Sequence, residues 1–189
     1  MAQQVATASP SGGASSATST PEAAAPLTAA DLQGRWWNWV ASSNPETDPV
    51  ADSDGRHCAS GQSGATWFLA DTATPTPVTR ECTVPTNAHL AFPIVNHLGT
   101  RQACDQFMAA ALGTAVLDGT MKEAERLGAV DIKIAGAPGN PVTSETPLST
   151  QACGLWIQLP PLSQGTHTLK IMGRAVAKSV DVTYTLHVQ

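Results

Sequence analysis

Charged side chains are scarce in this chain, since Asp, Glu, Lys and Arg make up 13% of its 189 residues and the formal net charge is −5. A protein that binds nucleic-acid phosphates needs a dense basic surface, which this composition does not supply. The chain also lacks any run of about 18 or more apolar residues, as a membrane-spanning helix would need. We therefore expect neither a nucleic-acid partner nor a membrane span.

The short motifs of common catalytic and metal sites are also missing. The five histidines form no H-x-H or H-E-x-x-H pair. The sequence around Ser63 lacks the G-x-S-x-G pattern of a nucleophile elbow. His167 shares a strand face with Leu169 and Ile171, and we interpret it as a hydrogen-bonded, structural histidine. The sequence thus declares no particular chemistry.

Four cysteines are present, Cys58, Cys82, Cys104 and Cys153, and none belongs to a C-x-x-C pair. Zinc sites and redox-active dithiols usually draw on such close pairs, so wide spacing favours two structural disulfides. Of the three possible pairings we favour Cys58 with Cys82 and Cys104 with Cys153, because each then joins a sequence-local half of the chain. Disulfides persist in oxidising compartments, so the protein is predicted to be secreted, in the periplasm or outside the cell.

Residues 1–28 consist mainly of Ala, Ser, Thr, Pro and Gly. They offer too little apolar area to offset the cost of ordering the backbone, roughly 1–2 kcal/mol per residue, which predicts a disordered linker or stalk. The segment lacks the basic start and apolar core of a signal peptide, and we expect that such a peptide was removed and Met1 added for expression. A native cytosolic start would instead leave the cysteines reduced. Residues 29–189 are predicted to form one β-rich domain.

Alternating apolar and polar residues predict several strands in this domain. The clearest alternation runs from Val180 to Val188 and is typical of a strand with one buried and one wet face. Shorter alternating runs occupy 130–134 and 155–159. With the Gly- and Pro-rich turns between them, these strands predict an antiparallel β-sandwich, jelly-roll-like, with two disulfides and one helical insertion.

The helical insertion is predicted from about Asp105 to Leu127. Apolar residues recur there at three-to-four spacing. Gly113 and Asp118-Gly119 interrupt the pattern, so we expect two helical pieces.

A long hairpin is predicted on the N-terminal side of this insertion. Its strands would lie near 65–70 and 78–84, with a Thr- and Pro-rich turn between them. A disulfide between Cys58 and Cys82 would then close its base.

The chain contains two groups of short motifs. The first group comprises Asp54-Gly55 to Cys58, Gly61-Gln62-x-Gly64-x-x-Trp67-Phe68-Leu69, Arg80-x-Cys82-x-Val84-Pro85 and Phe92-Pro93-Ile94-Val95-Asn96. The second comprises Trp156-x-x-Leu159-Pro160-Pro161-Leu162-x-x-Gly165-x-His167-Thr168 and Asp181-Val182-Thr183-Tyr184-x-Leu186-x-Val188. Together they resemble a group of uncharacterised secreted bacterial proteins over most of residues 36–188, with the largest departure at about 105–150. The resemblance implies export and a compact β-rich domain, and it carries over no activity.

Three of the five tryptophans, Trp36, Trp37 and Trp39, lie within four residues. They either pack a first strand or short helix onto the core, which we favour, or offer an aromatic surface for a sugar ring. On a strand, Trp37 and Trp39 would share one face and Trp36 would take the other, so one indole would be exposed. Trp36 and Trp67 are therefore the candidate stacking residues.

A polar loop before the first cysteine carries Asp48, Asp52, Asp54 and His57. Ca²⁺ requires clustered oxygen ligands, so the three aspartates are candidates for an irregular calcium site, although the EF-hand pattern is incomplete. The alternative needs no metal, because aspartate also starts turns by bonding its own backbone. His57 beside Asp54 is the best candidate for an acid–base pair.

Three functions of different classes remain open. The first, which we favour, is a non-catalytic binding module for a polysaccharide or another component of the cell envelope, with Gln62, Asn96 and Arg80 among its contacts. Gln62 and Asn96 could equally be buried amides that satisfy loop backbone. The second is a secreted hydrolase or lyase that uses His57 and Asp54, with Asn96 or Arg80 holding a developing oxyanion. The third is a structural or adhesive surface protein whose tryptophans all lie in the core.

Overall fold

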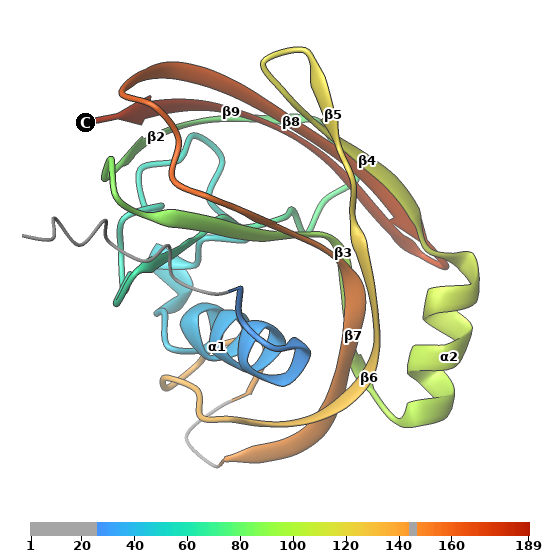
Figure 1. The fold of residues 1–189 in the computed structure, drawn as a ribbon. Coiled ribbons are helices and arrows are strands. Elements are labelled where there is room, and N and C mark those ends of the chain that lie inside the picture. Colours follow the sequence, from blue (N-terminus) through green and yellow to red (C-terminus); the bar gives the residue numbers. More distant parts are fainter. Residues whose placement is uncertain (1–25, 144–146) are drawn as a thin grey trace, which may run out of the picture.

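The computed structural model describes residues 26–143 and 147–189, in which two β-sheets pack on each other (Figure 1). This confirms the prediction of a mainly β, sandwich-like domain. The elements in chain order are α1 (Ala29–Ala41), the short 3-10 helix η1 (Pro45–Thr47), β1 (Thr66–Phe68), β2 (Val78–Val84), β3 (His89–Gly99), α2 (Arg101–Ala110), β4 (Leu112–Leu117), β5 (Thr120–Lys122), β6 (Glu125–Ile134), β7 (Leu148–Leu159), β8 (Gly165–Ala175) and β9 (Lys178–Val188).

The first sheet has the strand order β1-β3-β7-β6, and the second has the order β2-β9-β8-β4-β5. β1 runs parallel to β3, and β2 runs parallel to β9, whereas the other neighbours are antiparallel. Both sheets are therefore mixed rather than wholly antiparallel, because β1 and β2 each join a partner that a tight turn cannot reach. The jelly-roll topology stays a prediction.

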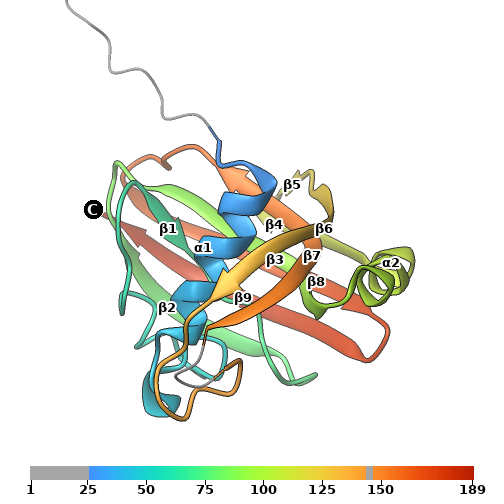
Figure 2. The ribbon, with the colours of Figure 1, turned by 90° about the horizontal axis from the view of Figure 1, so that it is seen from below.

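Helix α1 covers the outer face of the first sheet, which Figure 2 shows from below. Its N-terminus is capped by Thr28, whose side chain accepts the backbone N–H of Asp31. Trp36 is fully buried and meets Trp156 of β7 edge-on, with ring centroids 5.7 Å apart. Such aromatic pairs add about 0.5–1.5 kcal/mol beyond area burial, so the tryptophan cluster fastens this helix to the sheet.

The main core lies between the two sheets. The predicted alternation in β9 is confirmed, because each of its apolar residues from Val180 to Val188 is buried and its polar residues are not. In the first sheet, β3 carries a bulge between Pro93 and Val95. The bulge breaks the alternation of β3, and the whole run from Leu90 to Asn96 is buried.

The predicted helical insertion is wrong beyond Ala110, where α2 ends. The chain instead forms the β4–β5 hairpin, whose turn contains Asp118 and Gly119 with φ angles of 49° and 79°. An Asp-Gly pair with left-handed φ angles is a hairpin signal, and it outweighs the short apolar periodicity on either side. The same pair therefore lies in a turn between strands, not at a break between two helical pieces as predicted.

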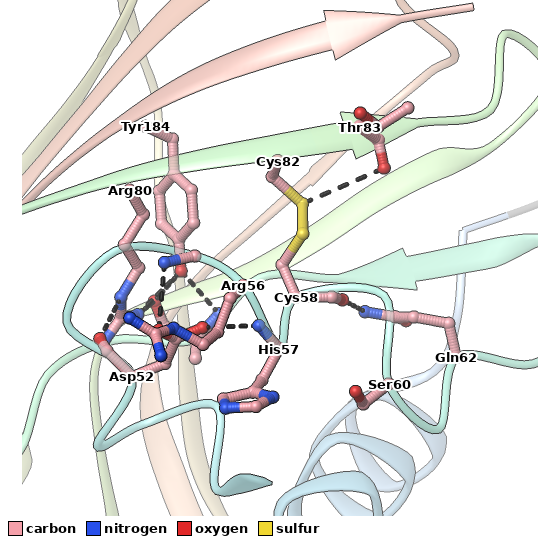
Figure 3. The surroundings of a disulfide bond; sticks show 12 residues. Asp52, Arg56, His57, Cys58, Ser60, Gln62, Arg80, Cys82, Thr83 and Tyr184 are labelled. Atoms are coloured by element: carbon pink, nitrogen blue, oxygen red, sulfur yellow. Dashed lines mark hydrogen bonds between the residues drawn. A yellow bond between two sulfur atoms is a disulfide. The ribbon is translucent and has the colours of Figure 1, made fainter.

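Both predicted disulfides are confirmed, Cys58 with Cys82 and Cys104 with Cys153. The hairpin predicted for the first pair is wrong, because β1 belongs to the first sheet and β2 to the second. This disulfide therefore ties a loop to the second sheet (Figure 3). The other disulfide fastens α2 to β7.

The disordered tail predicted for residues 1–28 falls outside the described residues, except for its last three. Of these, Leu27 exchanges backbone hydrogen bonds with the side chain of Gln158, at 2.8 and 3.1 Å, and Thr28 caps α1. The ordered domain therefore begins slightly before residue 29. No helix in the described ranges is long and apolar enough to cross a membrane.

Candidate functional site

The predicted acidic loop folds around the carboxylate of Asp52, which is 7% exposed. This carboxylate accepts the backbone N–H groups of Asp54 at 3.1 Å and of His57 at 2.8 Å (Figure 3). Asp48 accepts the backbone N–H of Val50 at 2.9 Å. Both aspartates therefore start turns by bonding their own backbone, which is the metal-free alternative considered above.

The geometry does not support the calcium prediction. Asp48, Asp52 and His57 do line one polar hollow of about 210 Å³. Within residues 26–143 and 147–189, however, no group of three or more His, Cys, Asp or Glu side chains is placed to hold a metal ion.

Asp54 pairs with the guanidinium of Arg56. Arg56 Nε donates to the carboxylate oxygens of Asp54 at 2.9 and 3.1 Å, and Arg56 Nη2 donates at 2.5 Å. These hydrogen bonds hold the pKa of Asp54 far below its ordinary value. In the part of the chain that is described, no hydrogen bond joins Asp54 to the ring of His57. A carboxylate bound in this way stays ionised and is held by Arg56, and the acid–base role of His57 and Asp54 stays a prediction.

Two of the predicted ligand contacts serve the fold instead. The prediction of an exposed Trp36 is wrong, because its indole is 0% exposed and donates to the carbonyl of Leu69 at 3.0 Å. Gln62 donates to the carbonyls of Cys58 and Phe68, both at 2.8 Å, and accepts the N–H of Phe68 at 3.0 Å. Its amide is thus committed to the loop around β1. Trp67 is only half-buried, and it stays a prediction as a contact residue.

The side chain of Arg80 is buried and holds the surrounding loops in place. Its side chain is 1% exposed and donates to Tyr184 Oη at 2.8 Å. It also donates to the carbonyl of Asp52 at 2.7 Å (Figure 3), and to those of Val50 at 2.9 Å and Asp71 at 3.0 Å. Five donors on one planar group suit such a bundle of acceptors. Arg80 therefore fastens two loop segments to the second sheet and holds Asp71 in place.

A buried ion pair lies beside this support. Lys178, the first residue of β9, pairs its ammonium with the carboxylate of Asp71 and donates to Asn96 Oδ1 in β3 at 2.7 Å. Asp71 is 1% exposed and Asn96 is 2% exposed. Asn96 Nδ2 is also buried, and it has no hydrogen-bond partner among the described residues. Buried polar groups are normally satisfied, although Gln33, Gln151 and three tryptophans also carry buried atoms without a partner among the described residues.

The same lysine lines a cleft of about 590 Å³, which we call the Lys178 cleft. Its walls come from α2, from the turn between β8 and β9, from the loop at 72–75 and from the end of β3. Most of the lining side chains are apolar, Phe107 of α2 among them. An apolar hollow of this size with a few convergent polar groups is typical of a small-molecule site.

His97 forms part of the cleft wall and stacks on Phe107, with ring centroids 5.0 Å apart and planes inclined by 14°. Burial, followed by the positive charge of Lys178, lowers the pKa of His97 below its ordinary value of 6.5. At neutral pH this ring is therefore uncharged.

The rim of the cleft carries a strained residue. Val176, in the β8–β9 turn, is 76% exposed and has a φ angle of 50°. A β-branched residue rarely adopts this left-handed conformation, which costs on the order of 1–2 kcal/mol. Backbone strain of this kind gathers at ligand-binding positions.

A larger and more open hollow, of about 720 Å³, lies at the ends of β3, β6 and β7. Two of its polar side chains bond to neighbours, since Gln151 donates to Asp131 at 2.8 Å and Thr150 donates to the carbonyl of Gly99 at 3.3 Å, whereas Gln151 Oε1 is buried without a partner among the described residues. The Lys178 cleft instead places a buried charge pair behind apolar walls, and this combination makes it the candidate site.

Of the predicted contact residues, only Asn96 and Arg80 belong to this region. Sequence reasoning missed Lys178, Asp71 and His97 as site residues, because they are distant in sequence and no motif joins them. One local signal was available, since the β8–β9 turn places an apolar Val176-Ala177 pair where turn residues are usually Gly, Asn or Asp.

A scan against protein-family models found no family that matches this chain. Searches among curated proteins and among solved structures also found no match. The resemblance to secreted bacterial proteins therefore stays a prediction.

Proposed function

We propose that this chain is a non-catalytic ligand-binding domain of an exported protein, and that the Lys178 cleft holds the ligand. One observation carries the proposal: an apolar cleft of about 590 Å³ is lined by the ammonium of Lys178, which a buried carboxylate and a buried amide hold in place. Burying such an ion pair is costly, and a structural apolar pair would serve stability as well. A contact between Lys178 and a ligand would explain why a charged pair, rather than an apolar one, occupies this position.

We prefer binding to catalysis because the described structure shows no hydrogen bond between Asp54 and the ring of His57, the two proposed acid–base residues. Asp54 is bonded to Arg56, and the hydrogen bond from His57 to Asp52 comes from the backbone N–H of His57 rather than from its ring. Arg80, which was a candidate to hold an oxyanion, donates its hydrogen bonds to buried carbonyls and to a tyrosine hydroxyl instead. The hydrolase or lyase remains the alternative that a product assay tests.

The setting of the domain is proposed to be the periplasm or the cell exterior. Two disulfides support this compartment, since such bonds persist where the environment is oxidising. A component of the cell envelope, including a polysaccharide fragment, is then a reachable ligand. A long polysaccharide would need an open aromatic surface, and the buried Trp36 does not supply one.

One observation favours the structural or adhesive alternative. Trp36, Trp39 and Trp156 are all buried, so most of the aromatic area serves the core. That alternative predicts that no small molecule enters the Lys178 cleft.

Amide chemical shifts of the ¹⁵N-labelled domain would test the proposal. The probes are short cello-, chito- and malto-oligosaccharides together with small aliphatic and aromatic compounds, each recovered afterwards and checked for chemical change. We expect at least one probe to shift cleft amides saturably and to be recovered intact. Ala103→Leu in the cleft wall should weaken that binding, whereas Ala109→Leu on the exposed side of α2 should not. Altered probes would favour the enzyme, and the absence of any cleft shift would favour the structural protein.

A further inference from the structure

We infer that the ligand of the Lys178 cleft is a small amphipathic carboxylate, a molecule with an apolar body and one carboxylate head group. This inference rests on the proposed function and deepens it by naming the ligand class. It joins three observations, namely the available donor of Lys178, the charge of the cleft lining and the apolar character of the walls.

The ammonium of Lys178 has three N–H donors. One is directed to the carboxylate of Asp71 and one to Asn96 Oδ1, at 2.7 Å. The side chain is 26% exposed and lines the cleft, so the remaining donor is available there. Asn96 Nδ2 is also without a partner among the described residues, but it is buried and Asn96 does not line the cleft, so Lys178 is the donor that a ligand meets. An ammonium bonds a carboxylate more strongly than it bonds a neutral hydroxyl, because both partners are then charged.

The charge of the lining favours an anion over a cation. Among the described residues that line the cleft, Lys178 is the only permanently charged one, and no carboxylate is present. Asp71 lies behind Lys178 with 1% exposure, so a ligand meets the ammonium first. His97 is uncharged at neutral pH, because burial lowers its pKa, and it does not compete for the head group.

The walls favour a compact apolar body. Phe107, with the ring of His97 stacked on it, lines the cleft, and Val50, Ala175 and Val176 contribute further apolar surface. A volume of about 590 Å³ falls within the range of about 300–1,000 Å³ that small-molecule sites occupy. The cleft thus suits a single small molecule better than a polymer chain.

The test compares acids with their neutral amides. Octanoate and 2-naphthoate, and separately octanamide and 2-naphthamide, are titrated into the ¹⁵N-labelled domain up to about 10 mM, because single-head-group ligands bind weakly. We expect each acid to shift amides of α2 and of the β8–β9 turn and to bind at least about tenfold more tightly than its amide.

A paired variant removes the ammonium without stranding a buried charge. In Asp71→Asn/Lys178→Met we expect the acids to lose at least about tenfold in affinity and to bind no better than the amides. Lys170→Met/Asp181→Asn is the matched control, because it removes a half-exposed ion pair with a 3.7 Å separation from the solvent-facing side of the second sheet. Binding of the acids should be unchanged in the control.

The possible failures are distinguishable. Equal binding of acid and amide in the cleft would overturn the carboxylate while the proposed function survives. Acids that shift amides only outside the cleft would overturn the assignment of the site. If neither acids nor amides shift any cleft amide, and the oligosaccharides also leave the cleft unchanged, both the ligand class and the proposed function are wrong.

Discussion

Lys178 of β9 donates to Asn96 of β3 at 2.7 Å, and this hydrogen bond joins the two sheets where the Lys178 cleft begins. Each residue lies on a different sheet, and 82 residues separate them in the sequence. The same ammonium neutralises Asp71. The stability of this corner of the sandwich and the chemistry of the cleft therefore depend on the same charged group.

Lys178→Met should destabilise the domain by about 3 kcal/mol or more, because it leaves the carboxylate of Asp71 buried and unpaired. Asp71→Asn/Lys178→Met should recover most of this loss, since no buried charge remains. Urea unfolding followed by tryptophan fluorescence gives the free energies of unfolding. The ion pair would be unimportant for stability if the single variant proved no less stable than the double variant.

The pair Asp118 and His167 predicts a pH dependence of stability. His167 Nδ1 lies 2.6 Å from Asp118 Oδ2, and His167 Nε2 lies 2.8 Å from the carbonyl of Ser163. Both neighbours accept hydrogen bonds, Asp118 with the larger effect, so the pKa of His167 is raised. The hydrogen bond from His167 lowers the pKa of Asp118. The expected structural role of His167 agrees with these contacts.

The contribution of His167 to the free energy of unfolding is complete below its ordinary pKa of 6.5. It is lost as the pH rises through the raised pKa of the folded state. The contribution of Asp118 is complete above its ordinary pKa of 3.8 and is lost as pH falls. Asp118→Asn should therefore lower the free energy of unfolding most between these two values, by up to about 1 kcal/mol, since Asp118 is half-exposed. Urea unfolding from pH 3.8 to pH 9 checks this, and a loss independent of pH would contradict it.

Val176→Gly should stabilise the domain while it weakens ligand binding. Glycine adopts a φ angle of 50° without strain, so the substitution should raise the free energy of unfolding by on the order of 1 kcal/mol. Ala177→Gly is the control, because Ala177 has no positive φ angle and gains nothing from the change. Thermal unfolding gives the stabilities, and octanoate titration gives the affinities. An unchanged or lower midpoint for Val176→Gly would show that the turn is not strained.

Loss of the disulfide between Cys104 and Cys153 should open the cleft. Replacing either disulfide by alanine pairs should cost about 3–4 kcal/mol in the chain-entropy account. Only the pair Cys104→Ala/Cys153→Ala should also reduce amide-exchange protection in α2, because Cys104 fastens this helix to β7. Cys58→Ala/Cys82→Ala is the matched control. Equal protection of α2 in the two variants would mean that packing alone holds the helix.

Local patterns predicted much of the framework. The alternation in β9 is a property of neighbouring residues, and a strand with one buried face is the direct way to satisfy it. The segment from Leu112 to Leu127 shows the limit of this reasoning. Its apolar spacing suits a helix over a few residues, but pairing of β4 with β8 and β5 supplies the hydrogen bonds of a strand. Propensity is a weak guide where such long-range partners exist.

The candidate site was far less predictable. Asp71 follows an apolar strand and a loop, and Lys178 follows a hairpin turn, and neither carries a local mark of function. Their pairing depends on two sheets meeting at one corner. The aspartates and histidine that did form a conspicuous cluster, including Asp52 and His57, serve to shape a turn.

The sequence alone was enough to predict a mainly β domain, two disulfides and the face that β9 buries, because periodicity and cysteine spacing record these features locally, whereas the pairing of the cysteines was one preference among three until the structure confirmed it. Only the tertiary structure decided that the tryptophan cluster forms a helix, that both sheets are mixed, and that Lys178, Asp71 and Asn96 meet. The physical reason is that hydrogen bonds between distant strands and burial of a charge pair depend on which segments become neighbours, and that choice is made by the whole chain at once.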